Sequence, residues 1–283
     1  MYDKEDISIR FFSPRKELRS FVESYAILEC GSGFFGNKVV TCLPNGKCGI
    51  NIQLSGEINF FSPIARDTKN HDNITICGQM FNLPNSLHVG SKIKLLVATF
   101  VPFFYYQLFG FPQTMLLNNR FYLEELIGCE GVNITERILE AKDDCSRIDI
   151  LESFLLKKLI SSRNIIPSYL PFSIEFMNSN NGFINIKKLL SYCNISERCF
   201  ENNFKNIIGL PPKKYSRIIR VIKIAKLLQN NDSFNLDKIS DLYFDQSHMI
   251  HDFREVMLTT PGEFINNSKK YIVNYYGQFL KLN

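Results

Sequence analysis

The 283-residue sequence lacks the features that place a chain in or across a membrane. It contains no run of about 18 apolar residues, so a transmembrane helix is not indicated. Its first residues, MYDKEDISIRFF, carry acids where a secretory signal has a basic and then an apolar region. We therefore expect a cytoplasmic protein with no membrane partner.

Patterns typical of metal sites and enzymes are also missing. None of the eight cysteines has C-x-x-C spacing, which favours reduced, mostly buried side chains over a zinc or dithiol site. His71 and His88 are far apart, so the clustered His and Glu of a metal-dependent oxygenase are absent. With no Ser/His/Asp set, carboxylate pair or phosphate loop, we expect neither an enzyme nor a metal or other cofactor. The cysteines are Cys30, Cys42, Cys48, Cys77, Cys129, Cys145, Cys193 and Cys199.

The net charge of +5 is unevenly distributed. Residues 1–150 carry 15 Lys and Arg against 17 Asp and Glu, whereas residues 151–283 carry 18 against 11. The first segment therefore has a net charge of −2 and the second +7. A basic region attached to a slightly acidic one is consistent with a phosphate-binding module joined to another domain.

The first third of the chain alternates strand-forming runs with turn signals, which predicts a β-sandwich or barrel. The segment Pro14–Tyr25 is the exception, because Leu18, Phe21 and Val22 would share one face of a helix. The strand-forming runs are ISIRFFSP, YAILECGSG, KVVTC, the alternating stretch through Ile52 and Leu54, INFFSP, NITICGQM and KIKLLVATFVPF. Turns are expected at residues 31–33, 44–46, 55–56 and 84–86.

From about Leu123 the apolar spacing becomes helical. These helices either connect two domains, pair with a second subunit, or simply pack on the barrel. The stretch 164–171, NIIPSYLP, predicts a linker, and Asn178–Gly182 predicts a break between the next two helices. The apolar positions of the connecting helices are Ile134, Ile138 and Leu139, then Ile148, Leu151, Leu155 and Leu159.

Two similar cassettes follow, at Ile186–Tyr215 and Leu236–Phe264. Each has a short apolar helix, a tight turn, an amphipathic helix ending in Phe plus a base, and a stop marked by proline. This order is typical of a helix-turn-helix, whose second helix enters a DNA groove. A long helix from about Lys213 to Gln229 would join the two units.

In the first cassette, Asn194 suits the left-handed turn position and Ser196 is a natural N-cap. The second helix would bury its apolar face and present long polar side chains suited to base edges. The alternative is an ordinary solvated helix face. The first helix of the unit, which we call the positioning helix, would bury Ile186, Leu189 and Leu190. The second helix, which we call the reader helix, would bury Phe200, Phe204 and Ile207. The outward residues are Arg198, Glu201, Asn202 and Lys205.

In the joining helix, Arg217, Lys223 and Lys226 lie off the apolar stripe and could meet phosphates. Arg220 could do the same, but a structural ion pair is the favoured role. The stripe itself is Tyr215, Ile218, Ile219, Ile222, Ala225 and Leu228.

In the second cassette, Asp245 would cap a reader helix with Met249, Ile250 and Phe253 facing inward. The histidines at i and i+3 suggest a metal site, but we expect no third ligand nearby, so contact of one or both histidines with the DNA backbone, or a local hydrogen bond, is favoured. The positioning helix would use Leu236, Ile239 and Leu242, and the outward residues are Gln246, Ser247, His248 and His251.

The segments NISERCFENNFKNIIGLPPKKYSRIIR, IAKLL, YFDQSHMIHDF and TPGEF resemble the DNA-binding domain of AraC/XylS-family bacterial transcription regulators. The resemblance implies two helix-turn-helix units that read successive major-groove segments through the outward residues named above. Leu190, Asn194 and Leu258 depart from the family's usual Ala, Gly and Gly. The stretch Ile239–Asp245 is shorter than the family's turn and lacks its usual glycine.

The segments LPNGK, FVPFFYYQLFGFP and LEELIG with the helices after it resemble the sensor domains of some family members. This implies a cupin-like β-barrel followed by a helical connector. The aromatic run Phe103–Tyr106 either lines an apolar pocket or is core, and core is favoured. The expected architecture is α+β: a barrel at residues 1–120, a connector at 121–166 that is a candidate for dimerisation, and an all-α tandem helix-turn-helix domain at 167–283.

The expected function is a sequence-specific transcription regulator that binds double-stranded promoter DNA. Its other candidate partners are a small-molecule effector, a second copy of the chain and, for an activator, RNA polymerase. Control by a protein partner instead of a small molecule is one alternative. A small-barrel enzyme with a basic adaptor domain is the other, and no catalytic set supports it.

Overall fold

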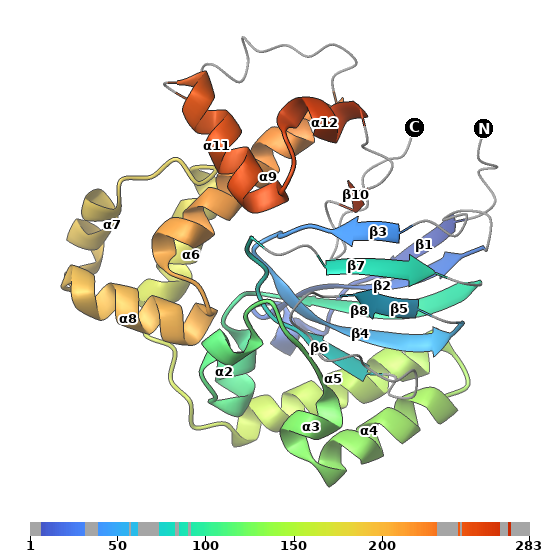
Figure 1. Ribbon diagram of the computed structural model, residues 1–283. Coiled ribbons are helices and arrows are strands. Elements are labelled where there is room, and N and C mark those ends of the chain that lie inside the picture. Colours follow the sequence, from blue (N-terminus) through green and yellow to red (C-terminus); the bar gives the residue numbers. More distant parts are fainter. Residues whose placement is uncertain are drawn as a thin grey trace.

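A computed structural model places a strand-rich N-terminal part beside an all-helical C-terminal part (Figure 1). It describes residues 7–31, 39–56, 58–61, 74–82, 85–89, 92–230, 243, 245–266 and 271–272. We call residues 7–161 the N-terminal part and residues 169–266 the C-terminal part. This arrangement confirms the expected α+β class.

The N-terminal part contains two sheets. The larger is antiparallel, with strand order β1-β2-β8-β4-β6-β9, and the smaller has the order β10-β3-β7-β5. Over the described residues the strands do not close into one barrel, in contrast to the barrel expected from the sequence. The strands are β1 Ile7–Phe12, β2 Val22–Cys30, β3 Val39–Cys42, β4 Cys48–Ser55, β5 Ile58–Phe61, β6 Ile74–Cys77, β7 Asn85–Val89, β8 Ile93–Phe100, β9 Arg120–Tyr122 and β10 Tyr271–Ile272.

The helix expected over Pro14–Tyr25 is wrong. Only Lys16–Leu18 is helical, as the short 3-10 helix η1, and strand β2 begins at Val22. The backbone of Val22 pairs with Phe100 of β8, and this long-range ladder overrides the local helical spacing. Strands β7 and β9 were not expected either: β7 begins at Asn85, within the turn proposed at 84–86.

Four helices pack on one face of the larger sheet (Figure 1). Ile138, Leu151 and Leu155 are fully buried there against strand residues such as Ile50 and Leu96. The connecting helices therefore pack on the sheet, which is one of the three alternatives given for them above. Their pairing with a second subunit stays a prediction. The helices are α2 Phe104–Phe109, α3 Leu123–Ile127, α4 Cys129–Glu140 and α5 Asp144–Ser161, with the 3-10 helix η2 at Gln113–Leu116.

The aromatic run Phe103–Tyr106 is largely core, as favoured from the sequence. Phe104 and Tyr105 are fully buried, and Phe104 packs edge-on against Phe100.

The cysteines differ more in burial than expected from the sequence. Cys30, Cys48 and Cys77 are buried, whereas Cys129, Cys145 and Cys199 are exposed.

A buried carboxylate ties the edge of the sheet to α5. Asp144, at the start of α5, is 8% exposed and accepts from Arg10 Nη2 of β1 at 2.6 Å. Lys94 Nζ of β8 and Arg147 Nη1 each lie 3.0 Å from its other oxygen. Burial alone would raise the pKa of Asp144, but the hydrogen bonds from Lys94 and Arg10 outweigh it and hold the pKa below its usual value.

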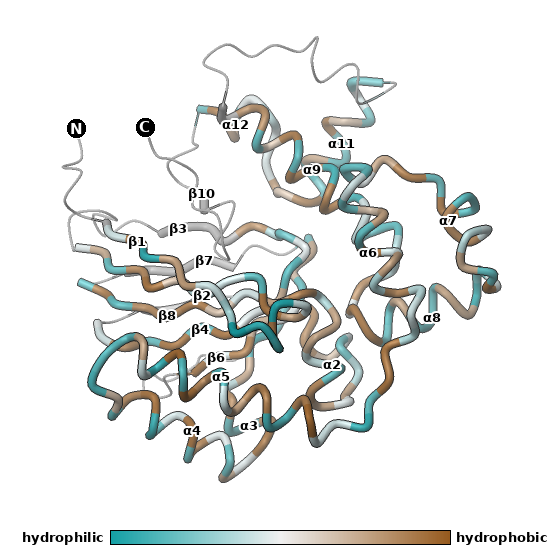
Figure 2. Tube along the Cα trace, turned by 180° about the vertical axis from the view of Figure 1, so that it is seen from behind, coloured by the Kyte–Doolittle hydropathy of each residue, from teal (hydrophilic) through white to brown (hydrophobic). Residues whose placement is uncertain are grey.

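In the C-terminal part, α9 lies between α8 and α11 in both views (Figures 1 and 2). Helix α6 begins at Tyr169, inside the expected linker, because Pro171 is tolerated in a first helical turn. The break at Asn181 and Gly182 is confirmed, with both residues at positive φ. The helices are α6 Tyr169–Ser179, α7 Ile186–Cys193, α8 Glu197–Ile208, α9 Pro212–Asn230, α11 Gln246–Met257 and α12 Pro261–Asn266. None of the described helices is long and apolar enough to cross a membrane.

Three of these helices end on a left-handed residue. Asn194 ends α7 with φ 49° and Gly209 ends α8 with φ 94°. Leu258 ends α11 with φ 58°. A left-handed backbone brings the Cβ of a leucine against the following carbonyl, whereas asparagine tolerates it and glycine has no Cβ.

We predict that Asp144→Asn weakens the fold and flattens its response to acid. The folded pKa of Asp144 is lowered, so its stabilisation is present above the unfolded value of about 3.9 and disappears as pH falls through the folded pKa. The variant should lose roughly 1–3 kcal/mol at neutral pH and show a smaller further loss in acid than the wild type. Urea unfolding from neutral pH to about pH 3 measures both. Asp149→Asn, at an exposed carboxylate, is the control, and identical acid profiles for the wild type and Asp144→Asn would contradict the prediction.

We predict that Leu258→Gly stabilises the protein by about 1 kcal/mol, because it removes the left-handed strain from a side chain that is 44% exposed. Asn194→Gly is the matched control and should change stability by roughly a few tenths of a kcal/mol. Melting temperatures of the two variants test this. A lower melting temperature for Leu258→Gly would show that the leucine side chain contributes more by packing than it costs in the backbone.

Candidate DNA-binding surface

The first helix-turn-helix has the local structure expected from its sequence. Helix α7 ends at the left-handed Asn194, and the Ser196 side chain caps α8 by accepting from the backbone N–H of Cys199 at 3.4 Å. Phe200 and Phe204 on the inner face of α8 are fully buried. Because the cap and the buried face fix both the start and the rotation of α8, its opposite face is presented to solvent.

The outward face of α8 bears the four residues proposed from the sequence. Arg198, Asn202 and Lys205 are exposed, and Glu201 is half-buried. They recur at intervals of three and four, so they form one stripe along the helix. Within the described part of the chain, none of the four side chains forms an ion pair or a hydrogen bond, so their donors and acceptors are available to a ligand.

The Arg217 side chain on α9 is not free to bind a phosphate, because it is paired within the protein. Its Nε lies 3.0 Å from Asp252 Oδ1, and its Nη1 is hydrogen-bonded to Glu255. Asp252 is only 1% exposed, so its charge requires this pairing. The charge of Arg217 is thus largely matched within the chain, and a role at DNA stays a prediction.

Arg220 forms the structural ion pair favoured from the sequence. Its Nη1 lies 3.1 Å from Asp252 Oδ2, and its guanidinium sits 5.0 Å from the Phe183 ring and 5.4 Å from the Tyr243 ring. The Tyr243 hydroxyl donates to the same carboxylate oxygen at 2.9 Å. Burial, and then the nearby Asp252 charge, raise the pKa of Tyr243. We call Arg217, Arg220, Tyr243, Asp252 and Glu255 the Asp252 cluster; it links α9 to α11 and to Tyr243, and Phe183 from the segment after α6 packs against it.

The second reader helix, α11, is also capped as expected. The Asp245 side chain accepts from the backbone N–H of Ser247 at 2.9 Å, and Met249 and Phe253 are buried. Ile250, expected inside, is only partly buried. The positioning helix through Leu236, Ile239 and Leu242 and the shortened turn before Asp245 lie outside the described residues. The proposed contacts Gln246, Ser247, His248 and His251 are all exposed.

The histidines of α11 have acidic neighbours on the same helix, at spacings that were overlooked in the sequence. His248 Nε2 lies 3.9 Å from Asp252 Oδ1. Ligand atoms of His251, Asp252 and Glu255 lie within 4.8 Å of one another, so the expectation that no third ligand is near was wrong. Both carboxylates are already bound by Arg217, and a metal ion would have to displace that cation. The cluster is therefore explained by an internal ion pair.

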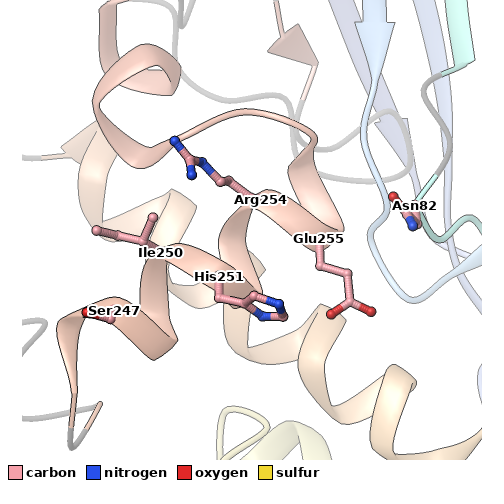
Figure 3. A pocket seen from close by; sticks show the side chains of 6 residues that line it. All are labelled: Asn82, Ser247, Ile250, His251, Arg254 and Glu255. Atoms are coloured by element: carbon pink, nitrogen blue, oxygen red, sulfur yellow. The ribbon is translucent and has the colours of Figure 1, made fainter.

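A cleft of about 500 Å³ separates α11 from the N-terminal part (Figure 3). Its helix side continues the outward stripe of α11, and Asn82 faces it from a loop after β6. Arg254 was missed as a candidate contact, although its spacing of three from His251 and seven from Ser247 would have placed it on the same stripe. The cleft is lined by Asn82, Ser247, Ile250, His251, Arg254 and Glu255.

Solved structures similar to this chain are those of bacterial regulators. The structure of ToxT from Vibrio cholerae O395 is 13% identical with a TM-score of 0.46, and covers 88% of this chain and 98% of that one. A fatty-acid-bound ToxT from V. cholerae strain SCE256 is 11% identical with a TM-score of 0.44, covering 94% and 96%. The AraC-like transcriptional activator CuxR is 11% identical with a TM-score of 0.20, covering 88% and 80%. No protein-family model and no curated protein sequence matches the chain.

These solved structures are only weakly similar to this chain. Their TM-scores are below 0.5 and their identities are 13% or less. The similarity is too slight for any property of those proteins to be carried over to this chain. The candidate surface therefore depends on its own residues and their placement.

We predict that Asp252→Ala destabilises the protein by about 3–5 kcal/mol, because it leaves Arg217 and Arg220 without their buried counter-charge. His251→Ala, one residue away on the exposed side of α11, should change stability by less than about 0.5 kcal/mol. Urea unfolding of both variants measures the difference. Equal midpoints would show that the Asp252 cluster does not hold the helices together.

Proposed function

We propose that this protein is a sequence-specific transcription regulator that binds double-stranded DNA through α8 and α11. The observation that carries the proposal is the occurrence of two capped amphipathic helices on either side of α9, each with a buried aromatic face and an exposed polar face (Figures 1 and 2). Helices of this kind fit the major groove, where each base pair presents a distinct pattern of donors and acceptors. We propose no enzymatic activity.

The side chains of α8 suit direct readout of bases. Arginine pairs with the O6 and N7 of guanine, asparagine with the N6 and N7 of adenine, and a carboxylate accepts from the amino group of cytosine. We assign these roles to Arg198, Asn202 and Glu201, and a phosphate contact to Lys205. All four lie on one stripe of a helix whose inner face is locked by Phe200 and Phe204.

The second reader would contribute Gln246, Ser247, His248 and His251, all exposed near the start and along the outer face of α11. These four carry no fixed positive charge, and Arg254 adds one cation to the same stripe. We therefore assign α11 a smaller share of the phosphate attraction than α8 and α9, where Arg198, Lys205 and Lys223 supply the positive charge.

The N-terminal part would sense an effector or mediate dimerisation, and the domain division at residues 120 and 166 is part of this proposal. An effector would change the populations of arrangements that let both readers engage DNA. Control by a protein partner, without a small molecule, is the alternative. For an activator, RNA polymerase would be a further partner, and the site of action would be the cytoplasm.

We predict that Arg198→Ala costs about 1–3 kcal/mol of binding free energy on a duplex selected by the protein, and much less on random duplex. The reason is that a bidentate contact to guanine is lost only where that guanine is present. Fluorescence anisotropy with the two duplexes at one salt concentration measures both affinities. Lys205→Ala is the control, and should weaken both duplexes alike and reduce the salt dependence of binding.

Equal loss on the selected and the random duplex would move Arg198 to the phosphate-contacting class. Failure of the wild-type protein to select any duplex from a random pool would contradict the proposed function itself.

A further inference from the structure

Loops at one end of the N-terminal sheets reach into the hydrophobic cores of the C-terminal part. Phe103, just before α2, is 7% exposed and packs in the cluster that contains Phe200 and Phe204 of the first reader helix. Leu43 and Phe81, 2% and 4% exposed, belong to the cluster built by α9 and α11. Each helix-turn-helix core is thus completed by residues from the N-terminal part.

The fit between the two parts is close at two glycines. A Cβ added to Gly209, which ends α8, would lie 2.9 Å from the backbone oxygen of Gln113 in η2. A Cβ added to Gly46 would lie 2.9 Å from Ile219 Cδ1 on α9, and Gly46 itself has φ +73°. The Gly209 contact is with backbone and leaves no room for a methyl group, so the end of α8 is held directly against η2. The Gly46 contact is with the end of a side chain, and it places the middle of α9 against the loop that contains Gly46.

Phe81 is the residue of the N-terminal part that contacts both α9 and the core around α11 in the second helix-turn-helix. Its ring lies 4.5 Å from Lys214 Nζ at the start of α9, and its side chain packs in the cluster with Met249 and Phe253 of α11. The next residue, Asn82, faces the outward side of α11 across the cleft (Figure 3). A shift of this loop would therefore displace α9 and α11 together.

We propose that Phe81, supported by Leu43, is a positioning residue that sets where α11 lies relative to α8, and that the N-terminal part controls DNA binding through this contact. The inference rests on the proposed function and adds the route of regulation to it. The first reader is braced separately, by Phe103 and Gln113. The N-terminal part is thus the common support from which both readers are aligned.

Alignment matters because two linked readers gain affinity only when both reach their half-sites at once. Loosening the support of α11 lowers the effective concentration of the second reader at its half-site. Binding through α8 alone does not depend on that support. The ratio of affinities on two-site and one-site DNA therefore reports positioning, whereas a general loss of folded protein lowers both equally.

The test uses the full-length chain and a duplex that it selects from a random pool, long enough for two adjacent major-groove segments, or roughly 20 base pairs. A second duplex has the half-site contacted by α11 scrambled. Phe81→Ala should lose about tenfold or more on the two-site duplex and bind the one-site duplex as the wild type does. Phe81→Leu, which retains most of the apolar volume, should recover much of the two-site affinity.

Phe154→Ala is the matched control. Phe154 is 6% exposed, contacts Lys158 Nζ at 5.9 Å, and packs in the cluster between the larger sheet and its helices, away from the C-terminal part. Its removal should destabilise the fold without changing the two-site to one-site ratio. Measurements are made well below the melting temperature of every variant. If Phe81→Ala does not fold, Leu43→Ala, which removes the supporting side chain from the same cluster, takes its place and should lower the ratio in the same direction.

The positioning role is overturned if the wild type selects DNA but Phe81→Ala, or Leu43→Ala in its place, keeps the wild-type affinity ratio, or if Phe154→Ala changes that ratio as much. A wild type that selects no duplex overturns the proposed function, and this inference with it. The expected pattern supports both: a lowered ratio in Phe81→Ala, largely restored in Phe81→Leu, and an unchanged ratio in Phe154→Ala.

Discussion

The buried carboxylate of Asp252 is the constraint on which the C-terminal part depends. It lies on α11, receives Arg217 and Arg220 from α9, and accepts a hydrogen bond from Tyr243. Removing a carboxylate from water costs several kcal/mol, and only these converging cations and the hydroxyl offset that cost. This pairing has two consequences. It holds α11 against α9, and it occupies two arginines that would otherwise be free to bind DNA phosphates.

The same cluster explains why charge alone is a poor guide to the DNA surface. Residues 151–283 carry a net charge of +7, yet two of the arginines on α9 are matched internally. Arg220 is also enclosed by the rings of Phe183 and Tyr243. The unpaired donors of α8 make that helix the better candidate for reading bases. Burial and pairing therefore decide which cations a ligand can reach.

The N-terminal and C-terminal parts of the protein share hydrophobic cores, so the contact between them is not only polar. Phe103 enters the first helix-turn-helix core, and Leu43 and Phe81 enter the second. A close-packed junction transmits displacement because its side chains cannot shift independently. This gives a one-component regulator of the proposed kind a physical route from its N-terminal part to both readers.

Local interactions were determined by the sequence itself. Ser196 and Asp245 cap their helices, and Asn194 and Gly209 end theirs, because these effects need only neighbouring residues. Tertiary structure alone decided that Val22 joins a strand and not a helix, because its partner Phe100 is distant in the chain. It likewise decided that Arg217 is paired and that Phe81 serves the second core. Each of these depends on segments that the sequence separates and only folding brings into contact.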